Sequence, residues 1–163
     1  MKRVEGKVAL VTGGTLGLGE ASAIMLAKEG AKVVVSDINE EGESVVSEIK
    51  RAGGEAIFVK HDVANEKDWM HTIDATLKEF GKLDIVVNNA GVALAKSIED
   101  TTLEDWHWLM SINLEGVFLG TRYGIQAIKK HGQGGSIINV SSIDGIIGDP
   151  LLAAYNASKG CVR

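Results

Sequence analysis

The chain has 163 residues, of which 45% are hydrophobic and 24% are charged, a balance typical of an ordered globular domain and not of a disordered tail. Its formal net charge of −5 argues against a nucleic-acid partner, and no apolar run approaches the ~18 residues that a membrane span needs. The single cysteine, Cys161, cannot form an internal disulfide, which together with the lack of an apolar signal core at the N-terminus predicts a cytoplasmic location.

Strand and helix signals alternate along the chain. Short continuous apolar runs predict buried strands near residues 7–12, 31–36, 55–60, 83–87 and 135–140. Helical patterns cover residues 17–29, 40–52, 66–80 and 103–131, and a last helix begins near residue 153. This alternation predicts a doubly wound α/β fold, in which a parallel sheet is covered by helices on both faces, as one domain over residues 1–163.

A glycine-rich turn joins the first predicted strand to the first predicted helix. It reads Thr12-Gly13-Gly14-Thr15-Leu16-Gly17-Leu18-Gly19, with the spacing Gly-x-x-x-Gly-x-Gly. Glycines let the backbone approach a pyrophosphate, and the N-terminus of the following helix offers free N–H groups with a partial positive charge. The turn therefore predicts a dinucleotide-binding site, with a ligand-free connection as the structural alternative.

Asp37 follows the second apolar run and ends the second predicted strand. A carboxylate at this place can accept hydrogen bonds from an adenosine ribose and would repel a 2′-phosphate. No basic residue stands at Thr15, Ile38 or Asn39 to neutralise such a phosphate. We therefore predict NAD as the cofactor in preference to NADP; the alternative is an aspartate that only closes a turn.

Tyr155 and Lys159 are four residues apart in the last predicted helix and so share one of its faces. An ammonium close to a phenol favours the phenolate, which would let Tyr155 exchange a proton with a substrate near neutral pH. Taken alone, the pair is a weak signal, because tyrosine and lysine at this spacing occur on many solvated helices.

Histidines and tryptophans add no further site. His61, His71, His107 and His131 show no metal-ligand spacing and are interpreted as surface residues, so no metal is predicted. The tryptophans at positions 69, 106 and 108 are expected to pack helices onto the sheet.

These motifs occur in an order that resembles the short-chain dehydrogenase/reductase family over the whole chain. Residues 12–19 resemble that family's cofactor turn, Asp62-Val63 its adenine-side pair, and Asn88-Asn89-Ala90-Gly91 the tetrapeptide that ends its fourth strand. For Asn88 and Asn89 a structural role and a direct cofactor contact are equally open. The resemblance implies the strand order 3-2-1-4-5, with further strands beyond the fifth in the complete family fold.

Four residues match the family's catalytic tetrad, namely Asn113, Ser142, Tyr155 and Lys159. The interval of 13 residues between Ser142 and Tyr155 selects Ser142 over Ser141 as the active serine. The stretch 138–160 is most similar to bacterial NAD(P)-dependent secondary-alcohol dehydrogenases. Together these matches imply an oxidoreductase that transfers a hydride between NAD(H) and a small or medium secondary alcohol or ketone.

The resemblance also implies a role for each site residue. Tyr155 would be the general acid/base, and Lys159 would hold the nicotinamide ribose. Ser142 would donate a hydrogen bond to the substrate oxygen, and Asn113 would bind a water at a backbone irregularity in the long helix. The expected cofactor-binding residues are Gly13, Thr15, Leu16, Gly17, Leu18, Gly19, Asp37, Ile38, Asp62, Val63, Asn89, Ala90, Gly91, Tyr155 and Lys159. The expected substrate residues are Leu94, Ser142, Asp144, Ile147, Leu152 and Tyr155.

Several alternatives stay open. Asp144 could bind a second substrate hydroxyl or serve structurally, and sugar, polyol and steroid substrates are not excluded. The family's domain is longer than 163 residues, so the chain is expected to be truncated soon after its catalytic helix begins. A dinucleotide-binding fragment without turnover is therefore one alternative, and a non-catalytic protein that reuses the fold is another. By resemblance, the 103–131 helix and the helix after Tyr155 would form a homo-oligomer interface, in a dimer or tetramer.

Overall fold

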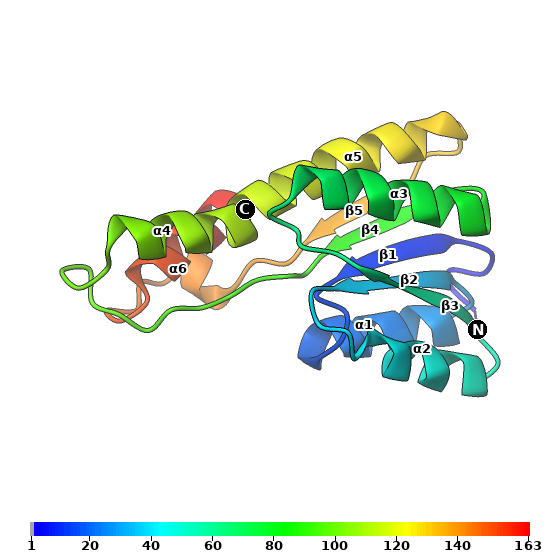
Figure 1. Ribbon diagram of the computed structural model, residues 1–163, viewed down its shortest axis with the longest axis horizontal. Coiled ribbons are helices and arrows are strands. Elements are labelled where there is room, and N and C mark those ends of the chain that lie inside the picture. The colour runs from blue at the N-terminus through cyan, green and yellow to red at the C-terminus, as the bar shows by residue number, and fades with distance from the viewer. Residues whose placement is uncertain (1) are drawn as a thin grey trace.

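The computed structural model describes residues 2–163, which form a parallel sheet with helices on both faces (Figure 1). The strands are β1 (Val8–Thr12), β2 (Lys32–Asp37), β3 (Glu55–Lys60), β4 (Ile85–Asn88) and β5 (Ser136–Asn139). The helices are α1 (Gly17–Lys28), α2 (Gly42–Arg51), α3 (Glu66–Phe80), α4 (Leu103–Met110), α5 (Gly116–Lys130) and α6 (Ala153–Val162). All strand pairs are parallel in the order β3-β2-β1-β4-β5, which confirms the predicted α/β fold and sheet order.

The centre of the sheet is buried on both faces, which explains the continuous apolar sequence of its strands. Successive side chains of a strand point to opposite faces. Accordingly, Ala9 and Val11 of β1 join the core beneath α1 and α2, whereas Val8 and Leu10 join the core beneath α3 and α5. Figure 1 shows these two helix pairs on opposite faces of the sheet. Packing on both faces fixes the positions of the strands relative to one another. The candidate site lies at their carboxyl ends.

The predicted helix 103–131 consists of three segments. α4 begins after Thr102, whose hydroxyl accepts a hydrogen bond from the Asp105 backbone N–H while the Asp105 carboxylate accepts from the Thr102 backbone N–H. A π-helical segment, η1 (Ser111–Glu115), then connects α4 to α5. Such wide turns are often found at functional sites, and this one carries Asn113.

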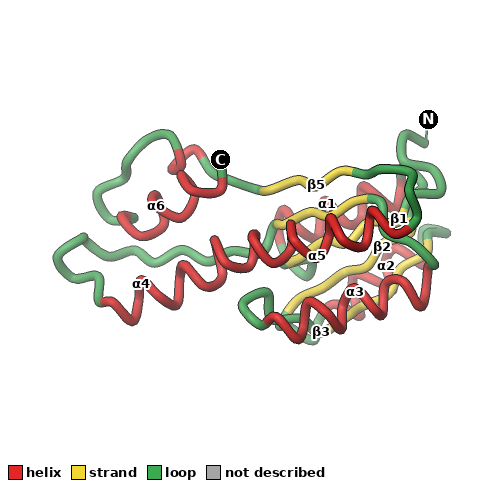
Figure 2. Tube along the Cα trace, turned by 90° about the horizontal axis from the view of Figure 1, so that it is seen from above, coloured by secondary structure: helices red, strands yellow, loops and turns green. Residues whose placement is uncertain are grey.

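α6 lies beyond the sheet, next to α4 and η1 (Figures 1 and 2). The chain leaves the edge strand β5, forms the 3₁₀ turn η2 (Ile143–Gly145) and then enters α6. β5 pairs with β4 and is largely exposed; Ile138 in this strand is 44% exposed.

The prediction that the histidines lie on the surface is wrong for His61, which is 1% exposed. Its backbone N–H donates to the Asp37 carbonyl oxygen, so residue 61 continues the alternation of β3 and its ring is carried under α3. There it packs edge-to-face on Trp69 with the ring centroids 4.4 Å apart. The tryptophan prediction holds for Trp69 but is wrong for Trp108, which is 46% exposed because α4 extends past the sheet (Figure 1).

Over residues 2–163, none of the helices combines the length and the apolar character that a bilayer crossing requires. The same residues contain no cluster of three or more His, Cys, Asp or Glu side chains suited to a metal ion.

Candidate functional site

A cavity of about 510 Å³ opens at the carboxyl ends of β1 to β4. This is the edge at which doubly wound sheets bind their ligands. Every residue predicted to bind a cofactor lines this cavity except Gly17, Tyr155 and Lys159. Four further residues line it that the sequence analysis did not predict, namely Asn39, His61, Val92 and Ile112. All four adjoin predicted site residues in the chain, with Ile112 next to Asn113, so adjacency was the available signal.

The glycine turn approaches the neighbouring strand too closely for side chains. Gly13 has a φ of +62°, and a Cβ atom there would lie 2.8 Å from the Cα of Ala90. A Cβ at Gly19 would overlap the carbonyl oxygen of Gly13. In the described part of the chain, Leu16 before α1 makes no side-chain cap, so the first N–H groups of α1 are left for an anion.

Asp37 ties β2 to the glycine turn. One of its carboxylate oxygens accepts from the backbone N–H (3.2 Å) and the hydroxyl (2.8 Å) of Thr15. The other accepts from the backbone N–H of Asn39 at 3.1 Å. The carboxylate therefore stabilises the wall of the cavity through the protein's own donors.

The two asparagines at the carboxyl end of β4, Asn88 and Asn89, also serve the framework. The Asn89 amide donates to the carbonyl oxygens of Thr12 (2.9 Å) and Gly13 (3.1 Å). The Asn88 amide donates to the Asn139 side chain at 2.8 Å and so links β4 to β5. Both asparagines thus have a structural role, and Asn89 also lines the cavity, so a direct cofactor contact by Asn89 stays a prediction.

The tetrad candidates come from three separate parts of the chain: Asn113 from η1, Ser142 from the β5–η2 connection, and Tyr155 and Lys159 from α6. The Lys159 ammonium lies 5.7 Å from the centroid of the Tyr155 ring and donates to the Val140 carbonyl oxygen at 2.9 Å. Lys159 is only 5% exposed, and burial lowers the pKa of its ammonium. A Cβ at Gly91 would lie 3.3 Å from the Lys159 nitrogen and 3.2 Å from the Asn113 side-chain oxygen. Lys159 and Asn113 therefore meet beside Gly91, which lines the cavity.

Asn113 is fully buried, and its side chain is occupied by the protein. Its oxygen accepts from the Val92 backbone N–H at 2.8 Å. Its amide donates to the Val92 carbonyl oxygen (2.9 Å) and to the Ser158 hydroxyl (3.0 Å). The side chain therefore joins η1 to the β4–α4 loop and to α6.

The neighbouring serines 141 and 142 have different partners. The Ser142 hydroxyl donates to the Asp144 carboxylate at 3.1 Å and accepts from the Asp144 backbone N–H at 3.1 Å. The Ser141 hydroxyl instead donates to the Lys159 carbonyl oxygen at 2.7 Å, which attaches α6 to the end of β5.

The predicted substrate residues lie on two segments that run side by side. The backbone N–H of Lys96 donates to the Leu151 carbonyl oxygen at 2.8 Å, and Lys96 forms a parallel bridge with Leu152. Leu94 is partly buried, whereas Ile147 is 59% exposed. The structure thus places the segment that carries Leu94 beside the segment that carries Ile147 and Leu152. The second segment is open to solvent at Ile147.

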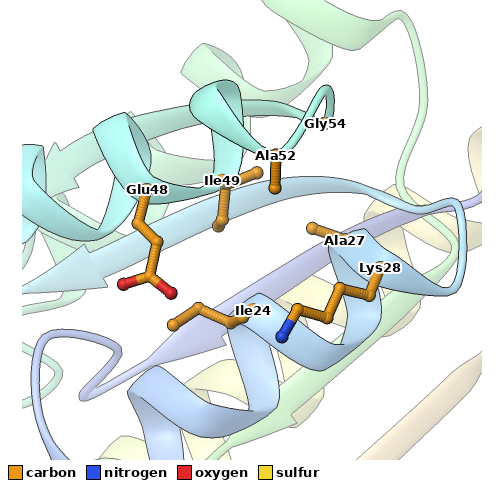
Figure 3. A pocket seen from close by; sticks show the side chains of 7 residues that line it. All are labelled: Ile24, Ala27, Lys28, Glu48, Ile49, Ala52 and Gly54. Carbon is orange, nitrogen blue, oxygen red and sulfur yellow. The ribbon is translucent and has the colours of Figure 1, made fainter.

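A second cleft, between α1 and α2, is too small to be the main site. Its volume is about 40 Å³, its lining residues come from α1, α2 and the loop after α2 (Figure 3), and none of them belongs to the glycine turn. It is lined by Ile24, Ala27, Lys28, Glu48, Ile49, Ala52 and Gly54. A space of that size accommodates about a single water molecule.

Known proteins resemble this chain closely. A family model described as short chain dehydrogenase matches residues 7–163. The NADP-dependent (R)-specific alcohol dehydrogenase of Lentilactobacillus kefiri is 54% identical, with 99% of this chain and 64% of that protein covered. The cyclopentanol dehydrogenase of Comamonas testosteroni is 49% identical (100% and 65% covered), and a 3-beta-hydroxysteroid dehydrogenase of the same organism is 44% identical (98% and 61% covered). The chain therefore spans less than two thirds of the length of these relatives.

The predicted preference for NAD over NADP is contradicted by these comparisons, because a relative that shares 54% of its residues with this chain is NADP-dependent. The structure supplies a reason for the error. The Asp37 carboxylate is engaged by Thr15 and Asn39, so its place at the end of β2 reflects the anchoring of the turn. By the family match over residues 7–163 and the parallel sheet with its glycine turn, the chain belongs to the short-chain dehydrogenase family.

Proposed function

We propose that the chain is the cofactor-binding and catalytic part of an oxidoreductase that transfers a hydride between a nicotinamide dinucleotide and a secondary alcohol or ketone. The observation that carries the proposal is that Lys159 and Asn113 come together beside Gly91, which lines the cavity, with the Tyr155 ring centroid 5.7 Å from the Lys159 ammonium. Membership of the family supports it, as do relatives that are named for dehydrogenation of alcohols.

The cavity suits a dinucleotide. Its volume of about 510 Å³ is that of a ligand pocket for a molecule of this class. Gly13 and Gly19 leave room for a pyrophosphate against the backbone, and the N–H groups at the start of α1 would bind it. Asp62 and Val63 would lie at the adenine, and Lys159 at the nicotinamide ribose. When bound, the nicotinamide supplies or accepts the hydride.

The protein's own residues would manage the substrate proton. In alcohol oxidation the Tyr155 oxygen takes the hydroxyl proton, and in ketone reduction the Tyr155 hydroxyl returns it. The Lys159 ammonium, held by the Val140 carbonyl oxygen, lies 5.7 Å from the centroid of the Tyr155 ring and would place a positive charge near the transferred proton. Ser142 would donate to the substrate oxygen, for which its hydroxyl must turn away from Asp144.

We further propose a small or medium secondary alcohol or ketone as the substrate. Leu94, Ile147 and Leu152 present apolar surface, which suits such a molecule better than a charged one. A sugar, polyol or steroid hydroxyl is the alternative substrate class, and Asp144 would then accept a hydrogen bond from a second hydroxyl.

A cytoplasmic homo-oligomer is also proposed, with α4 and α5 in its interface. Trp108 is 46% exposed and Phe118 is 60% exposed on these helices. Large exposed apolar side chains of this kind are typical of association surfaces.

A dinucleotide-binding chain without turnover is the second candidate. β5 is a largely exposed edge strand, and the chain spans less than two thirds of its relatives. An exposed edge strand of this kind favours association with another segment or chain over stable isolation.

The two candidates are separated by replacing Tyr155 with Phe in the whole protein. We expect Tyr155→Phe to lower kcat by roughly 10²-fold or more, the scale of lost general acid–base catalysis, with an unchanged Kd for the dinucleotide. Turnover is followed through the absorbance of the reduced nicotinamide and binding through its fluorescence. Tyr123→Phe is the matched control, because Tyr123 is the only other tyrosine and its hydroxyl donates to Glu66 at 2.7 Å.

Near-normal turnover by Tyr155→Phe would refute the role of this tyrosine. Dinucleotide binding by the unmodified protein without turnover of any secondary alcohol or ketone would favour the second candidate.

A further inference from the structure

Ser158 lies between Tyr155 and Lys159 in α6 and is 0% exposed. Its hydroxyl donates to the carbonyl oxygen of Tyr155 at 2.8 Å. The oxygen of the Ser158 hydroxyl also accepts a hydrogen bond from the side-chain amide of Asn113 at 3.0 Å. One buried hydroxyl thus contacts the backbone of one tetrad candidate and the side chain of a second, and it directly precedes a third.

The bond between Ser158 and Asn113 is the side-chain link from α6 to the π-helical segment η1. Asn113 is itself immobile, because its oxygen and amide are bonded to both backbone groups of Val92. Ser158 therefore attaches α6 to a fixed point. Other contacts hold α6 at the side of β5, where Ser141 donates to the Lys159 carbonyl oxygen and Lys159 donates to that of Val140.

The orientation of α6 about its own axis matters for the proposed chemistry. Tyr155 and Lys159 are one turn apart and share a face, so any rotation of the helix displaces both side chains together. Contacts at β5 restrain one side of α6, and the bond to Asn113 restrains the other. Without the second restraint, a rotation of α6 would move the Lys159 ammonium away from Gly91 and would move the Tyr155 ring with it.

We propose that Ser158 is a positioning residue that fixes the rotation of α6, and with it the Tyr155 hydroxyl and the Lys159 ammonium, by accepting the hydrogen bond of Asn113. The proposal rests on the proposed function and deepens it. Ser158 does not touch the reacting atoms; it acts through the two side chains that flank it.

A purely local role is the competing explanation. Serine hydroxyls in helices often donate to a carbonyl oxygen one turn earlier, as Ser158 does to Tyr155, without functional effect. That bond explains what the Ser158 hydroxyl donates to, but it does not explain why the Ser158 oxygen accepts a hydrogen bond from Asn113. Loss of the Ser158 oxygen would deprive a buried Asn113 N–H of its partner, and a buried unpaired donor disturbs its surroundings.

The test compares Ser158→Ala and Ser158→Cys with a matched control in the whole protein. Cysteine keeps the volume of the side chain but is a poor hydrogen-bond partner. Thr76→Val is the control, because Thr76 is also 0% exposed and its hydroxyl donates to a carbonyl oxygen one turn earlier, in α3. Ser158→Thr restores the hydroxyl.

We expect both Ser158 variants to lower kcat roughly ten- to a hundredfold, the scale of a small misplacement of reacting groups. KM and Kd for the dinucleotide should change much less than kcat, because the residues that line the cavity lie outside α6 and only the contact of Lys159 with the nicotinamide ribose would be affected. Ser158→Thr should recover most of the lost kcat. Thr76→Val should lower the Tm by about as much as Ser158→Ala does, but its kcat should not change. Normal kcat in Ser158→Ala, beside an inactive Tyr155→Phe, would overturn the positioning role and leave the proposed function standing.

A second readout does not depend on turnover. Amide hydrogen exchange in α6 should accelerate in Ser158→Ala and Ser158→Cys, and it should stay unchanged in Thr76→Val. Unchanged exchange in α6 would overturn the inference. Faster exchange in a protein that turns over no secondary alcohol would support the attachment of α6 while the proposed function fails.

Discussion

Acidification should destabilise this protein through His61. The ring is 1% exposed, lies edge-to-face on Trp69 and shares a 3.1 Å hydrogen bond with the Ser36 hydroxyl. Its Nε2 atom has no hydrogen-bond partner among residues 2–163. Burial lowers the pKa of His61 from 6.5 to about 4, although the nearby carboxylates of Asp68, Asp62 and Asp37 act in the opposite direction. The imidazolium would also carry a second donor into a place that offers it no acceptor.

The sign and the magnitude follow from proton linkage. Above pH 6.5 the ring is neutral in the folded and unfolded states, so the free energy of unfolding does not depend on it. Between pH 6.5 and about 4 the unfolded chain takes up a proton that the folded ring refuses, and stability falls as the pH falls. At about 1.4 kcal/mol per pKa unit, the loss across this interval amounts to about 3 kcal/mol. That is a large share of the ~5–15 kcal/mol by which domains are stable.

Urea unfolding from neutral pH down to about pH 4.5 tests this expectation. His61→Gln should have a lower free energy of unfolding at neutral pH, because Gln fills the site less well, but it should lose less of it on acidification. His71→Gln is the control, since His71 is exposed on α3, the helix that covers His61, and the variant should behave like the unmodified protein. Equal pH dependence in His61→Gln and His71→Gln would refute the assignment of the acid sensitivity to His61.

Two further predictions concern the framework and the cavity. Burial raises the pKa of Asp84, but hydrogen bonds from the Val8 backbone N–H and from two lysines outweigh it and hold that pKa below 3.8. Asp84→Ala should therefore lower the free energy of unfolding by about 3 kcal/mol, as expected for breaking a buried ion pair, with no change in dinucleotide binding; a loss below ~1 kcal/mol in urea unfolding would contradict this. Gly19→Ala should abolish dinucleotide binding by calorimetry, because its Cβ would overlap the Gly13 carbonyl oxygen. Binding at the original affinity would show that the turn does not need this close approach.

Much of the fold could be predicted because the signals are local. Each strand is a short apolar run, and each connection to a helix contains turn or cap residues, so the boundaries of β3 and α3 agree with the predicted ranges. The π-helical segment within 103–131 could not be located, since the apolar pattern of a helix with one wide turn differs little from that of a regular helix. The burial of His61 also escaped prediction, because it depends on Trp69 of the following helix.

Residue types and spacing by themselves determined the fold class and the candidates Tyr155 and Lys159. The order of the strands was implied by the resemblance to a known family. Only the tertiary structure decided which hydrogen-bond partners each polar group has. Asp37 was interpreted as a ribose ligand, yet its carboxylate is bonded to Thr15 and Asn39. A hydrogen-bonding group has a few possible partners, and which of them it meets depends on distant segments that the fold brings within about 3 Å. Ser158 illustrates the same limit, because its partner Asn113 is 45 residues away in the chain.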